Sequence, residues 1–226
     1  MSLPIKPPFP PMEALLVKDL PRGATWQYEP KWDGFRCLAF RDGDHIELQS
    51  KSGQPLARYF PEIVEALLQL KARSFVIDGE LVITIKGEPS FDALLQRIHP
   101  AASRIAKLAK ETPARLIVFD VLVDEQGKQL FQEPLAKRRK KLDAFAKKFF
   151  ARSKSLELSP QTADAAIALS WLNDPGVKLD GVIAKRLDLP YRSGERDGMQ
   201  KIKKLRTADC VVGGFRWASK GKGVGS

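Results

Sequence analysis

Alternating apolar and polar positions predict an antiparallel hairpin early in the chain. The runs 36–41 and 45–49 are rich in β-forming residues and flank Asp42-Gly43. Asp-Gly supplies the positive φ angles of a tight two-residue turn, so the two runs are expected to pair. A further strand is expected to begin at 25–28, just before Lys31, which is then placed at the mouth of an antiparallel sheet.

Two longer apolar runs carry acids in their middle. The run 75–85 contains Asp78-Gly79-Glu80, and the almost wholly apolar run 116–123, typical of a central strand, contains Asp120. A carboxylate inside an apolar strand costs free energy unless it faces a cleft or a cation. Each of these acids is therefore predicted to have a partner.

Helices are predicted where the apolar period lengthens. Pro61 opens one, Ser90 caps a short one that runs through Arg97, and another covers 162–172. Pro134 begins a helix with Leu135, Leu142, Phe145 and Phe149 on one face. The other face of this helix is basic and carries Lys137, Arg138, Arg139, Lys140, Lys141, Lys147 and Lys148. Two interpretations of this face are open: a solvated surface, or a contact with nucleic-acid phosphates.

Near the C-terminal end, polar groups alternate with apolar ones in 180–185 and 199–204. At strand period, Lys185, Lys201 and Lys203 share one face of a sheet. Lysines aimed at one cleft repel each other unless a polyphosphate lies between them. The first 25 residues are rich in proline and are expected to drape over the domain in an extended conformation.

Composition adds an anionic partner to this picture. The net charge of +11 makes nucleic acid the first candidate, and the 43% hydrophobic share is ordinary for a globular protein. Cys37 and Cys210 lie far apart without metal-type spacing, so reduced thiols are expected. No run approaches membrane-spanning length, and no membrane association is expected.

The stretch 29–36 concentrates candidate chemistry. Lys31 is flanked by Trp32 and Phe35, and a desolvated lysine near other cations can become a nucleophile. The carboxylates of Asp33, Glu80 and Asp180 suit Mg²⁺, which bridges phosphate oxygens. The downstream lysines would neutralise phosphate charge, and Phe119 could stack on a base. Together these groups predict nucleotidyl transfer to Lys31.

The same set resembles the covalent nucleotidyltransferases, and most closely the ATP-dependent DNA ligases of the small bacterial repair type. Lys31–Arg36 matches the family's Lys-x-Asp-Gly-x-Arg nucleophile motif, which includes Asp33 and Gly34. Further matches, in the family's order, are Asp78-Gly79-Glu80, the aromatic-acid pair Phe119-Asp120, Asp180–Lys185 and Lys201-Ile202-Lys203.

The resemblance implies a role for each site residue. Lys31 would carry AMP, Glu29 would bind the adenine amino group, Phe119 would stack on adenine, and Glu80 and Asp180 would hold the metal. Ribose or phosphate contacts would come from Arg36, Lys51, Glu80, Lys185, Arg196, Lys201 and Lys203. This chain departs from the family at Lys51, where many members have arginine, at Asp180, which replaces glutamate, and at Met199, which replaces tryptophan.

The implied fold is α+β, an ATP-grasp-like nucleotidyltransferase domain of two largely antiparallel sheets flanked by helices, with the ATP cleft between them. This adenylation domain would cover 1–206, and 207–226 would be the first strand of a truncated OB-fold domain.

The implied reaction uses ATP and Mg²⁺ to seal nicked double-stranded DNA. A monomer in the bacterial cytosol, near the nucleoid, with repair or end-joining proteins as further partners, is expected. The alternatives are an RNA ligase, a capping-type nucleotidyltransferase, or a non-catalytic nucleic-acid-binding module.

Overall fold

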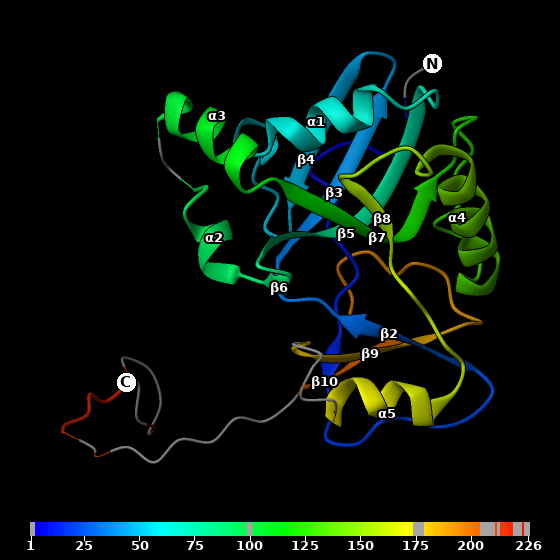
Figure 1. Ribbon diagram of the computed structural model, residues 1–226. Coiled ribbons are helices and arrows are strands. Elements are labelled where there is room, and N and C mark those ends of the chain that lie inside the picture. The colour runs from blue at the N-terminus through cyan, green and yellow to red at the C-terminus, as the bar shows by residue number, and fades with distance from the viewer. Residues whose placement is uncertain are drawn as a thin grey trace.

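The computed structural model describes residues 3–98, 101–173, 179–203, 211, 213–218 and 223. Two sheets form its centre (Figure 1). The large sheet has the order β4-β3-β5-β7-β8, with β6 paired to β5; the small sheet has the order β1-β10-β9-β2. Each sheet contains one parallel pair, β7 with β8 and β1 with β10, and is otherwise antiparallel. The expectation of two largely antiparallel sheets flanked by helices is confirmed.

The strands of the large sheet are β3 (Phe35–Asp42), β4 (His45–Ser50), β5 (Ser74–Ile85), β6 (Glu88–Pro89), β7 (Ala114–Val123) and β8 (Leu156–Leu158). Those of the small sheet are β1 (Leu15–Leu16), β2 (Trp26–Lys31), β9 (Gly181–Arg186) and β10 (Met199–Lys203). The helices are η1 (Ala57–Tyr59), α1 (Pro61–Leu68), α2 (Phe91–Leu95), α3 (Ala102–Glu111), α4 (Leu135–Phe149) and α5 (Ala165–Asn173).

Helices cover the outer sides of both sheets. In Figure 1, α1, α3 and α4 surround the large sheet, and α5 lies under the small sheet. Alternate residues of β3 divide between two core clusters: Cys37 and Ala39 pack with residues of α1 and α4, while Leu38 and Phe40 pack with the N-terminal segment. In the small sheet, Val182 and Ala184 of β9 face α5, which leaves the lysine face of β9 turned toward the large sheet.

Several sequence expectations are confirmed in this frame. The expected β3–β4 hairpin is present, although its two turn residues are Gly43 and Asp44, because Asp42 still pairs with His45; Gly43 has a φ of 65°. The acid-containing run 75–85 is one continuous strand, β5. Ser90 caps α2 through a hydrogen bond from the Ala93 amide at 3.3 Å, although the helix ends at Leu95 rather than Arg97.

The basic face predicted on α4 is wrong for two of its residues. Arg138 and Arg139 are buried, at 2% and 6% exposure, and neither is solvated nor available to nucleic-acid phosphates. Arg138 binds Asp120 with two hydrogen bonds of 2.9 Å, which supplies the partner that this buried acid required. The lysines of α4 remain exposed and lie on the outer side of the helix.

The N-terminal segment does more than drape over the domain. Leu3, Ile5 and Met12 are buried in the core cluster of the large sheet. A few residues later the chain joins the small sheet, where β1 pairs in parallel with β10. The segment therefore crosses from one sheet to the other.

Two motif glycines are required by close backbone contacts. A Cβ on Gly34 would lie 2.2 Å from the Leu81 carbonyl oxygen of β5. A Cβ on Gly181 would lie 2.0 Å from the Ile202 carbonyl oxygen, and Gly181 has a φ of +156°. Any other residue would push apart strands that carry site residues.

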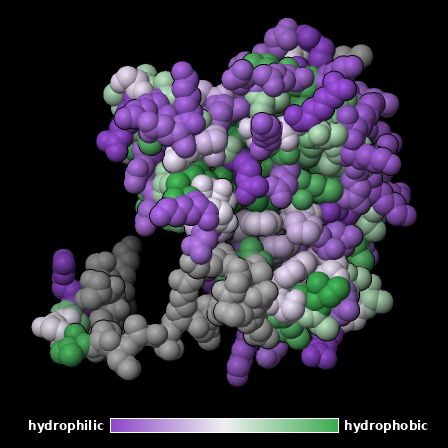
Figure 2. All heavy atoms as spheres, in the orientation of Figure 1, coloured by the Kyte–Doolittle hydropathy of each residue, from purple (hydrophilic) through white to green (hydrophobic). Residues whose placement is uncertain are grey.

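The domain boundary expected near 206 lies outside the described residues, as do 209, 210 and 212 of the strand expected in 207–226. The described residues 211 and 213–218 form no named strand, and only Trp217 among them is in a β-bridge. Cys37 is a buried free thiol, and Cys210 is outside the described part of the chain. Among the described residues, no helix is long and apolar enough to cross a membrane. Figure 2 shows polar side chains over most of the visible face, with apolar atoms gathered over α5 and beside α2.

Candidate active site

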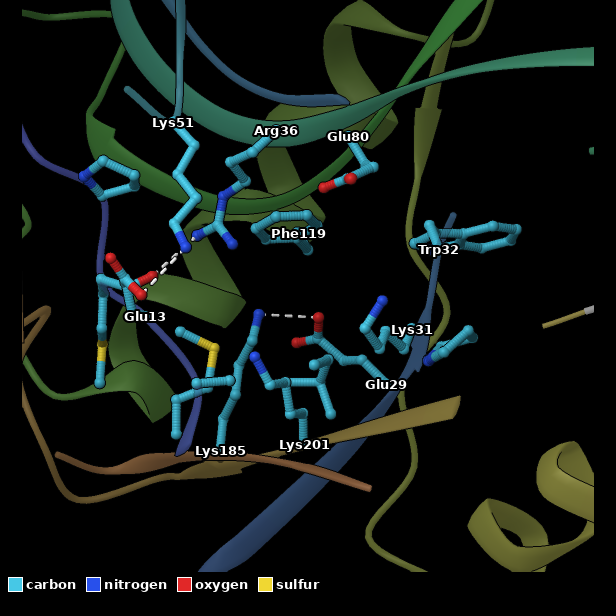
Figure 3. A pocket seen from close by; sticks show the side chains of 16 residues that line it. Glu13, Glu29, Lys31, Trp32, Arg36, Lys51, Glu80, Phe119, Lys185 and Lys201 are labelled. Atoms are coloured by element: carbon cyan, nitrogen blue, oxygen red, sulfur yellow. Dashed lines mark hydrogen bonds and ion pairs between the residues drawn. The ribbon is translucent and has the colours of Figure 1, made fainter. Parts of the chain in front are cut away.

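A cavity opens between the two sheets and collects most of the predicted site residues (Figure 3). The small sheet contributes its lysine face, the large sheet contributes β3, β5 and β7, and the N-terminal segment closes one side. The predicted residues in its wall are Glu29, Lys31, Arg36, Lys51, Glu80, Phe119, Lys185 and Lys201. Asp33, Gly34, Asp120, Asp180, Arg196 and Lys203 are not part of that wall.

Lys31 is the last residue of β2, and its side chain pairs with Asp180, which directly precedes the neighbouring strand β9. Its Nζ donates a hydrogen bond to Asp180 Oδ2, and Lys203 Nζ lies 3.5 Å from the same oxygen. Burial alone would raise the pKa of Asp180, but the two lysines hold it below its ordinary value. The Lys31 side chain is 19% exposed, so its amine is reachable from the cavity.

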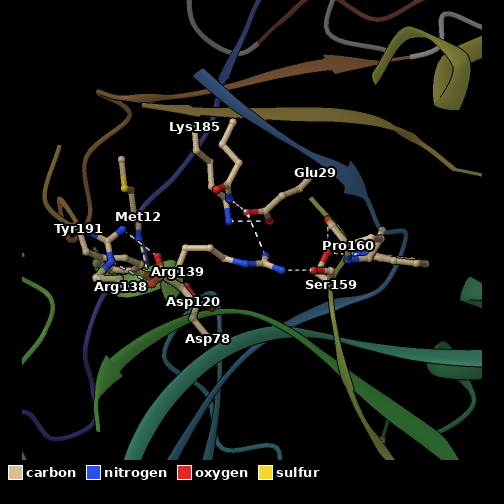
Figure 4. A network of polar contacts seen from close by, with 12 residues as sticks. Met12, Glu29, Asp78, Asp120, Arg138, Arg139, Ser159, Pro160, Lys185 and Tyr191 are labelled. Carbon is tan, nitrogen blue, oxygen red and sulfur yellow. Dashed lines mark hydrogen bonds and ion pairs between the residues drawn. The ribbon is translucent and has the colours of Figure 1, made fainter. Parts of the chain in front are cut away.

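Glu29 lies deeper in the cavity, two residues before Lys31 on the same face of β2. Its carboxylate accepts hydrogen bonds from Gln27 Nε2 at 2.8 Å and Lys185 Nζ at 2.7 Å. Arg139 of α4 approaches it to 4.0 Å and donates to the Ser159 carbonyl oxygen (Figure 4). Glu29 is 2% exposed and is held by groups from both sides of the cleft.

Arg36 and Phe119 form the cavity wall on the large sheet. Arg36 binds Asp78 through two hydrogen bonds of 2.6 Å, and the Tyr191 hydroxyl donates to the same carboxylate at 2.6 Å. Burial would lower the pKa of Arg36, but Asp78 raises it above its ordinary value. The Phe119 ring lies 4.5 Å from the Arg36 guanidinium carbon and 4.4 Å from Lys185 Nζ, measured to the ring centroid.

Glu80 follows Asp78 on the same face of β5, and no ion pair among the described residues neutralises it. Burial raises the pKa of Glu80 to about 7, against the opposing effects of Arg36 and Lys31. Asp78 and the exposed Asp33 add a smaller rise. Near neutral pH this carboxyl is therefore only partly ionised.

Lys201 is the cation of the cavity wall for which the described residues offer no hydrogen bond or ion pair. Burial lowers its pKa, and the charges of Lys203, Lys51, Lys31 and Arg196 lower it further. Its neighbours are cations, so an anion is the group that would stabilise its charged form.

The structure also brings in residues that sequence reasoning missed. Glu13 and Met12 of the N-terminal segment line the cavity, and Glu13 pairs with both Lys51 and Arg196. Tyr191 and Gln27 hold the motif acids in place. The proline-rich segment has no periodic pattern that predicts a strand or a helix. The one signal for Glu13 in the sequence is its position as a charged residue among hydrophobic neighbours. Met199, which departs from the family pattern, is buried at the cavity wall.

The described part of the site offers few side chains that bind metal ions. Among the described residues, no cluster of at least three His, Cys, Asp or Glu side chains could hold an ion. Mg²⁺ is commonly bound by one or two carboxylates together with substrate phosphates and water. The carboxylates of Glu80 and Asp180, on opposite sides of the cleft, fit an ion that enters with a nucleotide rather than a preformed metal site.

Comparison with known proteins assigns the class. The model of the ATP-dependent DNA ligase domain family matches residues 11–203. DNA ligase C1 of Mycolicibacterium smegmatis is 46% identical over all of this chain and 65% of its own length. DNA ligase C of Mycobacterium tuberculosis is 46% identical over 96% of this chain and 60% of its own length.

Solved structures agree. The ligase domain of M. tuberculosis LigD is 27% identical, with a TM-score of 0.66 over 86% of this chain and 60% of that chain. A mycobacterial DNA ligase D complexed with ATP and MES is 26% identical, with a TM-score of 0.63 over 85% of this chain and 60% of that chain.

The cleft between two sheets, with a lysine at the end of β2, is thus that of a nucleotidyltransferase domain. The chain belongs to the ATP-dependent DNA ligase family, of which it contains the adenylation domain. It spans 60–65% of the length of the curated relatives named above.

Proposed function

We propose that this domain transfers AMP from ATP to Lys31. The observation that carries the proposal is the arrangement at the cavity. The Lys31 amine lies at its edge, paired with Asp180, and Lys201, which has no partner among the described residues, lies in the same wall. Phe119 would stack on the adenine, and Glu29 would accept a hydrogen bond from its amino group. Arg36, Lys51, Lys185, Arg196, Lys201 and Lys203 would bind ribose or phosphate oxygens.

In the first step, Lys31 Nζ attacks the α-phosphate, an N–P bond forms, and pyrophosphate leaves. Asp180 Oδ2, which accepts a hydrogen bond from Lys31 Nζ, would orient the amine, and the proton that the amine must lose would pass to solvent water. Lysine charges around the leaving phosphates stabilise the transition state electrostatically. Mg²⁺, held by Glu80 and Asp180, would neutralise phosphate charge when bound.

In the following steps, AMP passes to the 5′-phosphate of a nick in double-stranded DNA, and the 3′-hydroxyl displaces AMP to seal the strand. These steps are proposed for the whole protein, because the chain spans only part of its relatives. We propose a role in DNA repair, a monomeric state and a bacterial cytosolic location. Repair or end-joining proteins are the proposed partners.

The first test is the intact mass after incubation with ATP and Mg²⁺. We expect an increase of one AMP on the wild-type chain and none on Lys31→Ala. Lys147→Ala, which removes an exposed lysine of α4, is the matched control and should still gain AMP. An AMP adduct that persists in Lys31→Ala would contradict the proposed nucleophile.

The nucleotide and the polynucleotide are tested separately. ATP and GTP labelled at the α-phosphate distinguish a ligase from a capping-type enzyme, which would take the label from GTP. Adenylated protein given nicked DNA or nicked RNA distinguishes a DNA ligase from an RNA ligase. Salt-sensitive DNA binding without any nucleotide adduct would instead favour a non-catalytic binding module.

A further inference from the structure

The carboxylates that neutralise the cavity cations differ in how easily they can be released. Asp78 and Glu29, which bind Arg36 and Lys185, are 0% and 2% exposed. Asp180 and Glu13, which bind Lys31 and Lys51, have side chains that are 31% and 26% exposed. A buried carboxylate that leaves its cation remains out of water with its charge uncompensated, whereas a partly exposed one can turn into water. Asp180 belongs to a motif of the family, but Glu13 belongs to none.

Glu13 joins cations from the two sides of the cleft. Its Oε2 lies 3.0 Å from Lys51 Nζ, in the turn that follows β4 of the large sheet. The same oxygen lies 3.2 Å from Arg196 Nη2, in the loop between β9 and β10 of the small sheet. Figure 3 shows the Glu13 carboxylate and the Lys51 amine meeting at the edge of the cavity, across from Lys201.

The backbone fixes Glu13 at this place, while its partly exposed side chain has access to water. The Glu13 amide donates to the Glu195 carbonyl oxygen at 2.8 Å, and the neighbouring Met12 is buried in the large-sheet core. The ion pair with Lys51, followed by the charge of Arg196, lowers the pKa of Glu13, so the carboxylate stays charged near neutral pH. Its cations also repel Lys201, as expected for groups gathered around one anion.

We propose that Glu13 is an internal counter-anion that competes with the leaving pyrophosphate for Lys51 and Arg196. The inference rests on the proposed function, since it assigns the terminal phosphates of ATP to these two cations. When ATP binds, the phosphates displace the Glu13 carboxylate. After AMP transfer, the carboxylate returns to both cations and favours release of pyrophosphate.

The test measures binding of inorganic pyrophosphate by calorimetry to chains whose intact mass shows no AMP. We expect Glu13→Gln to lower the dissociation constant for pyrophosphate about tenfold, since the change releases two cations at once and couplings between ligands are commonly about 5–150-fold. The constant for adenosine should not change. In adenylation assays, the same variant should show a lower KM for ATP and stronger inhibition by pyrophosphate.

Glu195→Gln is the matched control. It makes the same charge change in the loop next to Glu13, and the side chain of Glu195 has no hydrogen bond or ion pair among the described residues. Equal gains in pyrophosphate affinity for both variants would show a general charge effect and overturn the proposal. An unchanged or weaker affinity in Glu13→Gln would overturn it as well, by showing that Glu13 only positions the cations. These binding results do not depend on adenylation, so a failure to attach AMP to Lys31 would reject the proposed function separately.

Discussion

The charged motif residues of the two sheets are neutralised in different ways. On the large sheet, Asp78 and Asp120 are 0% and 3% exposed, and each accepts two hydrogen bonds from one arginine guanidinium. On the small sheet, Lys31 and Lys203 both pair with Asp180, which is partly exposed, and Lys201 has no partner among the described residues. Buried bidentate pairs are rigid and costly to break, whereas exposed pairs are weak and exchangeable. The large sheet is thus a fixed platform, whereas Lys31 and Lys201 of the small sheet present charges that can pass to a substrate. The small sheet also has one buried pair, Lys185 with Glu29, which resembles those of the large sheet.

The largest expected effect tests the fixed platform. Asp78→Asn removes a charge that Arg36 and Tyr191 both contact, and it leaves a largely buried guanidinium without its counter-charge. We expect a loss of about 3–5 kcal/mol in the free energy of unfolding, measured by urea denaturation. Asp33→Asn, at an exposed motif position, should change stability by less than about 0.5 kcal/mol.

A small loss in Asp78→Asn, comparable to that of Asp33→Asn, would mean that Arg36 finds water or another acceptor. The two sheets would then not differ in the rigidity of their charges. This outcome would remove the distinction on which the comparison depends.

The next effect separates two lysines of the same sheet face. Lys185 binds the buried Glu29, so Lys185→Met should cost about 3 kcal/mol of stability by leaving that carboxylate poorly neutralised. Lys201 is surrounded by cations, so Lys201→Met should leave stability within about 1 kcal/mol of wild type. Lys201→Met should nevertheless weaken ATP binding about tenfold or more, because a charge-assisted contact to phosphate is lost.

Calorimetric titration with ATP, together with urea denaturation of both variants, checks this pair. The comparison is contradicted if Lys201→Met unfolds more easily than Lys185→Met, or if it binds ATP as tightly as wild type. The first result would show an unrecognised partner for Lys201. The second would place the phosphates elsewhere.

Local patterns in the sequence were sufficient for the elements that carry the site, but not for the partners of its charges. The β3–β4 hairpin and the shared face of Lys185 and Lys201 depend on turn chemistry and strand period, which neighbouring residues determine. The need of Asp120 for a partner also followed from its apolar surroundings.

That this partner is Arg138 could not be predicted, because Arg138 stands among exposed lysines on α4 and only the docking of the helix buries it. Glu13 was missed for a related reason. Its segment has neither helical nor strand period, and its place beside Lys51 and Arg196 results from contacts between residues up to 183 positions apart.

The last expected effect concerns Glu80, which stands between the two kinds of charge. It lies on the large sheet, yet burial raises its pKa to about 7 because no arginine is committed to it as Arg36 is to Asp78. From an ordinary value of 4.5, this rise means that the folded state binds the proton more tightly than the unfolded state. The resulting stabilisation is complete below about pH 4.5 and is lost as the pH rises through about 7. Urea denaturation from pH 5 to 8 should therefore show that the stability of the wild type falls relative to that of Glu80→Gln. Glu65→Gln, at an exposed position of α1, is the control and should follow the wild type. Parallel curves for wild type and Glu80→Gln would mean that Glu80 is already neutralised like the other acids of its sheet.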